Sequence, residues 1–239
     1  MPLRLLIINP NGSSAITQLI KSGIDPHLGP DTLPTYWTCP DGPPALQSQD
    51  IDQNADTCFF LLLDILGDYD AFLLACYAVH PLVSLLQARV GSKPVVGIFE
   101  ASVDAALRVL QPSQRFAILT TGEAYEKHLE AGVVRLLGKP QADSCFAGVV
   151  STGIGVHDLA EESRGTAKEK MEVGVKKLLG KYGHGIAAIC IGGVILFGME
   201  PFIREAYQEQ LGPKAGQQII FIDQFEAGAV AVRNALRKK

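Results

Sequence analysis

Short runs of apolar residues recur along the chain and alternate with segments whose apolar residues follow a helical period. Continuous runs of this kind are typical of parallel strands that are buried on both faces, and they occur at Leu3–Ile8, Ala71–Ala75, Val95–Ile98, Phe116–Leu119, Gly148–Val150, Ile186–Ile189 and Ile219–Ile222. Segments 14–24 and 81–90 instead carry apolar residues three and four positions apart, as on one face of a helix. The alternation predicts an α/β fold in which each sheet is mainly parallel and is flanked by helices.

One stretch interrupts this alternation. Residues 29–50 are rich in proline and show little periodicity, which predicts a loop-rich insertion with one short extended strand at residues 35–37. Long loops inside compact domains often form the wall of a functional site. We therefore expect this insertion to border whatever site the protein carries.

The two halves of the chain carry similar pieces in the same order. The run Leu3–Ile8 precedes a polar loop, as Phe116–Leu119 does, and the runs at 72–76 and 186–190 both end in a cysteine. A third pair of runs, at 95–98 and 219–222, each leads to a Glu-Ala dipeptide. Such a repeat predicts two pseudo-symmetric α/β lobes, the first formed by residues 1–95 with 216–239 and the second by residues 96–215.

Composition and charge narrow the class of protein. With 239 residues, 47% of them apolar and 19% charged, the chain can bury a sizeable core, which excludes disordered and fibrous proteins. The net charge of −4 gives no basic surface for nucleic acid. The longest apolar stretch is glycine-interrupted and shorter than the about 18 residues of a membrane span, and the N-terminal run is too short for a secretory signal. We expect a cytoplasmic protein that binds neither nucleic acid nor membrane.

The cysteines and histidines argue against metals and disulfides. The chain has 5 cysteines, an odd number without any C-x-x-C pair, which predicts free thiols. The 5 histidines show no metal-ligand spacing. Segment 151–155 resembles a dinucleotide-binding loop but lacks its third glycine. The sequence therefore predicts neither a metal site nor a dinucleotide-binding site.

Two cysteines stand at predicted carboxyl ends of strands, where open parallel sheets bind ligands. A cysteine in an apolar run is usually an inert small hydrophobe, and we interpret Cys39, Cys58 and Cys145 in this way. The repeated position of Cys76 and Cys190 favours a functional interpretation instead, with one thiol from each lobe facing a shared cleft. In strand-to-helix turns, nearby helix N–H groups would lower the pKa of both thiols.

Polar loops accompany these cysteines. Residues 9–13 allow either a hairpin turn or a strand-to-helix loop, and the helical period that follows favours the loop, with Ser13 or Ser14 as N-cap. Its amides and the Asn11 side chain would then be available to an anionic or carbonyl-bearing ligand. Thr120 and Thr121 are the counterparts in the second lobe, where helix capping is the simpler role. His80 either polarises Cys76, caps the following helix or is solvated.

The segments that carry this chemistry resemble a known family. They are Ile8-Asn9-Pro10-Asn11-Gly12-Ser13, Ala75-Cys76-Tyr77-Ala78-Val79-His80-Pro81, Gly97-Ile98-Phe99-Glu100-Ala101 and Cys190-Ile191-Gly192-Gly193. Together they resemble the hydantoin racemases of the aspartate/glutamate racemase superfamily, particularly its fungal branch, whose members are linked to the use of allantoin. The resemblance extends essentially from end to end.

The resemblance implies two flavodoxin-like lobes with the active site in the cleft between them, a small hydantoin-like or allantoin-like substrate, no cofactor and a homo-oligomer. It implies that Cys76 and Cys190 are the acid/base residues. Carried over by motif, the residues that contact substrate are Asn11, Tyr77, Thr120, Thr121, Ile191 and Gly192. The sequence departs from bacterial relatives at Val79, His80 and Ile191, and these differences bear on the substrate more than on the mechanism.

The implied reaction explains why two thiols are present. Racemisation removes a proton from one face of a carbon and returns one to the other, so one cysteine acts as thiolate base and the other as thiol acid. The enolate formed at C5 would be stabilised by backbone N–H groups after the cysteines. Alternatives on the same scaffold are an amino-acid racemase, a decarboxylase or a maleate-type isomerase, and a non-catalytic ligand sensor is a further one. A decarboxylase needs only one proton donor, so the presence of both Cys76 and Cys190 argues against that alternative.

Overall fold

The computed structural model describes residues 2–155, 158, 164–183 and 185–237. These residues form two compact units. The first consists of residues 1–101 with 224–239, and the second of residues 102–223. The sequence prediction placed the boundaries after residue 95 and before residue 216, so the structure divides the chain a few residues later at both points.

The first unit is built on a four-stranded parallel sheet with the strand order β2-β1-β3-β4. In chain order its strands are β1 (Leu3–Asn9), β2 (Thr32–Thr38), β3 (Ala71–Leu74) and β4 (Val95–Gly97). Ile8 pairs with both Trp37 and Leu74, so the ends of β1, β2 and β3 are aligned. β2 arises inside the proline-rich insertion, where the sequence predicted a shorter extended segment.

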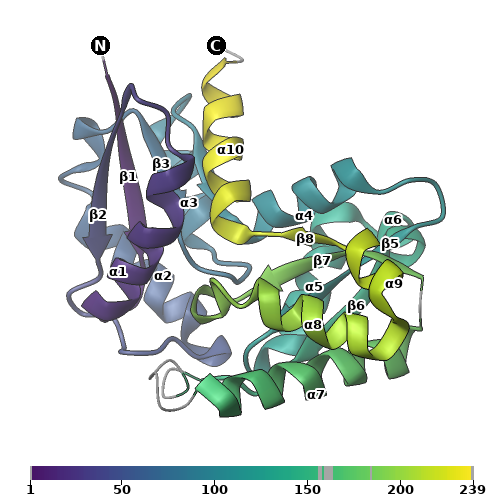
Figure 1. The fold of residues 1–239 in the computed structure, drawn as a ribbon. Coiled ribbons are helices and arrows are strands. Elements are labelled where there is room, and N and C mark those ends of the chain that lie inside the picture. The colour runs from purple at the N-terminus through teal and green to yellow at the C-terminus, as the bar shows by residue number, and fades with distance from the viewer. Residues whose placement is uncertain (1, 156–157, 159–163, 184, 238–239) are drawn as a thin grey trace. The chain divides into compact units, whose positions relative to one another are not determined.

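Helices cover both faces of this sheet because successive strand residues point to opposite sides. On one face lie α1 (Ser14–Ile24) and α10 (Gln224–Arg237), which contact each other (Figure 1). On the other face, Leu6, Ile8 and Phe72 form an apolar core with residues of the neighbouring helices α2 (Ile51–Leu62) and α3 (Leu82–Val90). Short 3-10 helices complete the unit at Asp25–His27, Ser48–Asp50 and Leu66–Asp68.

The second unit repeats this plan with the strand order β6-β5-β7-β8. Its strands are β5 (Arg115–Thr120), β6 (Phe146–Ser151), β7 (Ile186–Gly192) and β8 (Ile220–Ile222), all parallel. Each strand holds the place of its counterpart four strands earlier, as the sequence repeat predicts. Because β8 pairs with β7, residues 220–222 belong to the second unit, and only the helix that follows them belongs to the first.

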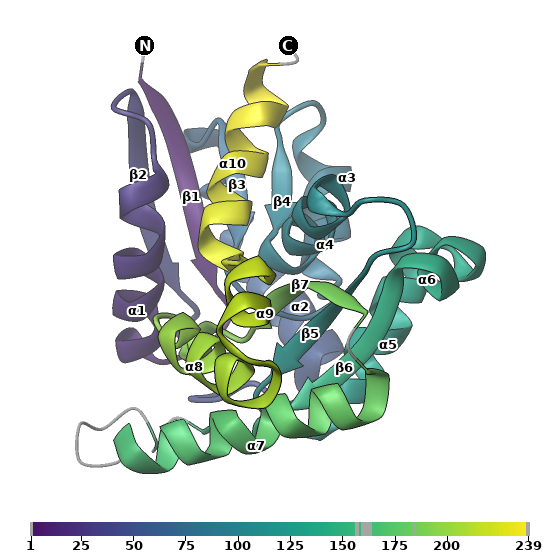
Figure 2. The ribbon, with the colours of Figure 1, turned by 45° about the vertical axis from the view of Figure 1, so that its right-hand side comes forward.

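The faces of the second sheet are covered by helices as well. α7 (Arg164–Tyr182) and α8 (Glu200–Leu211) share an apolar core with one face, and Figure 2 shows them on the same side of that sheet. The other helices among the described residues are α4 (Ile98–Val109), which begins in the first unit, α5 (Ala124–Leu137), α6 (Lys139–Cys145), the 3-10 helix Val194–Leu196 and α9 (Pro213–Gln218). Within the part of the chain that the structure describes, none of the helices is both long and apolar enough to cross a membrane.

Candidate active site

The carboxyl-end edge of the first sheet gathers two loops that the sequence singled out. β1 and β3 are neighbours in the sheet and end at the same level, because Ile8 pairs with Leu74 and the Ala75 N–H donates to the Ile8 carbonyl. The loop 10–13 after β1 and the segment 75–81 after β3 therefore start side by side. This is the edge at which parallel sheets bind ligands.

The loop after β1 connects a strand to a helix, which confirms the interpretation over a hairpin. The Ser13 hydroxyl accepts the Ile16 N–H at 3.3 Å and caps α1. The buried Asn9 side chain donates to Thr17 Oγ1 at 2.9 Å, while its Oδ1 accepts the Asn11 N–H at 3.0 Å. These bonds fix the path of the loop from within.

The Asn11 side-chain oxygen is buried and accepts no hydrogen bond from any described residue. A buried acceptor without a donor costs about 1–3 kcal/mol, so a ligand that brings a hydrogen-bond donor to this oxygen would offset that cost. The prediction that Asn11 binds substrate is consistent with this feature of the loop.

The predicted insertion packs against the same loop. The Gly12 N–H donates to the Pro43 carbonyl at 2.9 Å, and the Cys39 N–H donates to the Asn9 carbonyl at 3.0 Å. A side chain at Gly12 would overlap the Gly42 carbonyl, so the close approach requires glycine. Residues 39–43 thus form a wall beside the loop that carries Asn11.

Cys76 lies two residues beyond the end of β3 and is partly exposed. Burial and, to a smaller extent, the nearby Glu100 carboxylate together raise the pKa of its thiol to about 12. This corrects the expectation that helix N–H groups lower the pKa, because α3 begins only at Leu82, six positions after the sulfur-bearing residue. In this state of the protein, Cys76 is a thiol at neutral pH.

Glu100 is a site residue that the sequence reasoning did not select, although it belongs to a segment that was quoted. Its carboxylate occupies the space that a side chain at Gly97 would fill. Gly97, three positions earlier, was therefore the sequence signal that could have pointed to Glu100. Tyr77, which follows Cys76, is buried and packs its ring edge-to-face on Phe99 at 5.6 Å, so this aromatic pair anchors the backbone next to the thiol.

Cys190 lies in the second unit in a different local setting. It is inside β7, where it pairs with Ile118 and Ile222, and it is fully buried. Its thiol donates to the Ser102 carbonyl at 3.6 Å. The sequence predicted a turn directly after this cysteine, and that was wrong: β7 continues through Gly192, because its ladder with β5 extends to Thr120 and the Thr120 hydroxyl donates to the Gly192 carbonyl at 2.8 Å.

The other predicted residues of the second unit divide into two groups. Thr120 and Gly192 lie at the ends of β5 and β7, and the methyl group of Thr121 lies beside Gly193, where a side chain would crowd it. The Ile191 side chain is instead 2% exposed and belongs to the apolar core, so any contact from this residue to a ligand would come from its backbone.

Among the described residues, the remaining cysteines and histidines do not gather into a possible metal site. All five cysteines are free thiols, with Cys39 and Cys58 fully buried in the core of the first unit. The described residues contain no group of three or more His, Cys, Asp or Glu side chains that could hold a metal ion. His157 and His184 lie outside the described residues.

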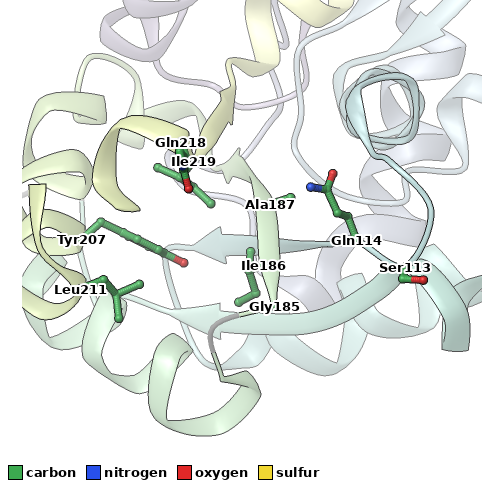
Figure 3. A pocket seen from close by; sticks show the side chains of 9 residues that line it. All are labelled: Ser113, Gln114, Gly185, Ile186, Ala187, Tyr207, Leu211, Gln218 and Ile219. Atoms are coloured by element: carbon green, nitrogen blue, oxygen red, sulfur yellow. The ribbon is translucent and has the colours of Figure 1, made fainter. Parts of the chain in front are cut away.

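A separate cavity of about 300 Å³ lies in the second unit, at the opposite end of β7 from Cys190. Its lining includes Ile186, which begins β7, and Tyr207 of α8 (Figure 3). The Tyr207 hydroxyl is buried without a partner among the described residues, and burial raises its pKa. Because this cavity lies at the amino end of the strand, it is distinct from the carboxyl-end site.

Comparison with known proteins finds a family match over most of the chain. A model of the Asp/Glu/hydantoin racemase family matches residues 5–232. An uncharacterized protein of Schizosaccharomyces pombe, C1F7.10, is 30% identical over 224 residues, which cover 91% of this chain and 90% of that protein. Protein DCG1 of Saccharomyces cerevisiae is 26% identical over 174 residues, covering 66% of this chain and 70% of that protein.

Solved structures with the same fold include racemases of different substrates. The allantoin racemase of Pseudomonas fluorescens matches with a TM-score of 0.76 at 20% identity, covering 99% of this chain and 92% of that one. Glutamate racemase RacE1 of Bacillus anthracis matches with a TM-score of 0.68 at 16% identity, covering 99% and 82%. At such identities these likenesses concern the fold.

Proposed function

The chain belongs to the Asp/Glu/hydantoin racemase family, and from that premise we propose that it racemises a 5-substituted hydantoin, in the first place allantoin, by proton transfer between two cysteines. The observation that carries the proposal is the placement of two free thiols on equivalent strands of two sheets with the same strand order. Cys76 follows β3, Cys190 lies in β7, and these strands hold the same place in their sheets.

The proposed chemistry needs both thiols on one substrate. One cysteine, as thiolate, takes the proton from C5 and becomes a thiol, and the electron pair of the broken C–H bond moves onto the C4 carbonyl oxygen. The other cysteine, as thiol, then gives its proton to the opposite face of C5 and becomes the thiolate. Each turnover therefore exchanges the protonation states of the pair, and the reverse reaction restores them.

Features of the first unit support a ring with N–H groups as substrate. The buried Asn11 Oδ1, which no described residue satisfies, is suited to accept a ring N–H. The raised pKa of Cys76 supports its role as the thiol that donates the proton at the start of a turnover. Thr120, Thr121, Tyr77 and the backbone at 191–192 are proposed to complete the binding site and to stabilise the enolate oxygen.

The test follows (S)-allantoin and an (S)-5-alkyl hydantoin in D2O by polarimetry and proton NMR, with the spontaneous reaction subtracted. We expect loss of optical rotation with deuterium entering at C5. Cys76→Ser and Cys190→Ser should each reduce racemisation by about 10²–10⁴-fold, the usual contribution of a general acid or base.

Two outcomes would contradict the proposal. If neither ring exchanges above the spontaneous rate, the hydantoin assignment is wrong. L-Glutamate and L-aspartate, tested in the same assay, would then identify an amino-acid racemase, and binding of a ring without exchange would identify a ligand sensor. If racemisation survives in both single variants, or if both variants exchange the C5 hydrogen of the same enantiomer, the two-thiol mechanism is wrong. Unchanged activity after dialysis against EDTA is expected, because the proposed steps use only protein groups.

A further inference from the structure

The ring of His80 is held by bonds at both of its nitrogens. His80 is 2% exposed, and its Nδ1 lies 3.3 Å from the Leu82 backbone nitrogen while its Nε2 lies 3.1 Å from Asn54 Oδ1. A backbone N–H can only donate, so Nδ1 is an acceptor, and the neutral ring carries its proton on Nε2. The Nε2–H therefore donates to Asn54. Both ring nitrogens thus have hydrogen-bond partners, one in α3 and one in α2.

Asn54 continues the chain of bonds to the neighbouring loop. Its side-chain Nδ2 donates to the Pro10 carbonyl at 3.0 Å, which leaves Oδ1 to accept from His80 and, at 3.5 Å, from the Cys58 thiol. Asn54 is 5% exposed and lies on the buried face of α2 beside Ala55. A polar network that is buried and fully bonded in this way fixes the positions of its members.

The two ends of this network lie in the two loops that carry the proposed site. Pro10 immediately precedes Asn11, and His80 ends the segment that begins with Cys76. A single side chain of α2 thus ties together the loop after β1 and the loop after β3. A displacement of about 1 Å in a catalytic group can cost about 100-fold in rate, so the link is suited to set the position of the thiol relative to Asn11.

We infer that His80 and Asn54 are positioning residues, which hold Cys76 and Asn11 in register for the reaction. This inference rests on the proposed racemase function. The simpler role for His80 is to cap α3 through Leu82, and the two roles depend on different ring nitrogens. They can therefore be separated by substitution.

Two replacements of His80 each keep one of its bonds. In His80→Gln, the side-chain amide nitrogen reaches the place of Nε2 and keeps the donor to Asn54, while the acceptor for Leu82 is lost. In His80→Asn, the shorter amide keeps an acceptor for Leu82 and loses the donor to Asn54. If His80 positions the site, the Gln variant retains more activity. If it only caps the helix, the Asn variant is at least as active as the Gln variant.

Asn54→Asp tests the other half of the network. The carboxylate still accepts from His80 but cannot donate to the Pro10 carbonyl, and it places a negative oxygen against that carbonyl. Gln53→Glu is the matched control, because it adds the same charge one residue away on the exposed face of α2. We expect kcat to fall by about 10–100-fold in His80→Asn and Asn54→Asp, with KM raised in Asn54→Asp, and both constants unchanged in Gln53→Glu.

A second measurement does not depend on the substrate. The rate at which iodoacetamide alkylates Cys76 is followed by peptide mass spectrometry between pH 7 and pH 10, with the fully buried Cys39 and Cys58 as internal references. We expect the pH profile of Cys76 to shift in His80→Asn and Asn54→Asp, to stay close to the wild-type profile in His80→Gln, and to be unchanged in Gln53→Glu. Far-UV circular dichroism checks that each variant is folded.

The outcomes separate this inference from the proposed function. If the wild type racemises hydantoins and His80→Asn keeps both kcat and the Cys76 profile within twofold, the positioning role is overturned and the function stands. If the wild type racemises no substrate but the Cys76 profile shifts as expected, the network positions the thiol and the proposed function fails. If His80→Asn alone fails to fold, Asn54→Asp still tests the inference. An unchanged pH profile of Cys76 in Asn54→Asp would also overturn it.

Discussion

Cys76 and Cys190 hold the same place in the order of strands but lie in different surroundings. Cys76 lies in a loop beyond β3, is partly exposed and has Glu100 beside it. Cys190 lies inside β7 with hydrogen-bonded strands on both sides, and its thiol donates to a backbone carbonyl. The two thiols therefore share a position in the order of strands but differ in exposure and in the groups around them.

The largest expected effect separates the tasks of the two thiols. With one base removed, the other can still take the proton from one enantiomer and return a deuteron to the same face. We expect Cys76→Ala to exchange C5 hydrogen of one enantiomer without inversion, and Cys190→Ala to do so with the opposite enantiomer. Racemisation should fall by about 10²–10⁴-fold in both. Proton NMR and chiral chromatography of (S)- and (R)-allantoin measure this, and exchange of the same enantiomer by both variants would refute opposed bases.

Next in size is a comparison of the packing of the two units. A side chain at Gly23 of α1 would overlap the Phe225 ring, and one at Gly148 of β6, where φ is +144°, would overlap the Tyr182 ring. Because overpacked sites typically lose about 1–3 kcal/mol, we expect both alanine variants to lower the free energy of unfolding, Gly148→Ala more because its backbone is also strained. Urea denaturation followed by circular dichroism measures both.

Trp37 and a third glycine sharpen this comparison. Trp37 is the single tryptophan and lies in β2, so its fluorescence reports on the first unit, and Gly23→Ala should shift its transition. Gly180→Ala is the control, because a side chain there meets open space on α7 and should stabilise the helix by about 0.5–1 kcal/mol. An unshifted Trp37 transition in Gly23→Ala would show that the interior next to α10 is looser than described.

A smaller effect concerns the pKa of Cys76. Removing the Glu100 charge in Glu100→Gln favours the thiolate, so the pKa of Cys76 should fall and alkylation at pH 8 should become faster. In the wild-type protein the pKa of Cys76 is raised to about 12, so the rate of Cys76 alkylation should still be rising at pH 10. Asp104→Asn, on the exposed part of the same helix and paired with Arg108, is the control. A slower reaction in Glu100→Gln would contradict the assigned cause.

The smallest expected effect lies in the second unit, away from its cysteine. Tyr207→Phe removes a buried hydroxyl without a partner among the described residues, so stability should rise by up to about 1 kcal/mol. Tyr182→Phe should instead lower it, because that hydroxyl donates to Glu130 at 3.4 Å. Thermal unfolding of both variants measures the sign of each change in stability. A destabilised Tyr207→Phe would mean that the Tyr207 hydroxyl forms a hydrogen bond in the folded protein.

Much of the fold was predictable because the strands are buried on both faces. Such strands are continuous apolar runs, and each predicted run coincides with a strand of the structure, while the helix predicted at 14–24 has the observed bounds. The capping role of Ser13 was also predictable, because N-caps follow local rules. Ile98 was expected to end a strand but begins α4, since an apolar residue at a strand-helix junction fits either element.

The candidate site was predictable only in part. The cysteines and the polar loops were found from their positions after apolar runs, and Asn54 had a signal that was overlooked, a polar residue on the apolar stripe of α2. The continuation of β7 past Cys190 had no such signal, because it depends on pairing with β5, which lies about 70 residues earlier in the chain. The roles of the individual site residues remain predictions.

The sequence by itself determined which segments become strands and helices, that the plan is repeated and that two cysteines stand at corresponding strands. These features follow from local periodicity and from the order of similar segments along the chain. Only the tertiary structure decided that β8 joins the second sheet, that burial and Glu100 raise the pKa of Cys76, and that Asn54 links the loops of Asn11 and Cys76. Pairing, burial and charge proximity depend on contacts between residues distant in the chain, and no local pattern encodes them.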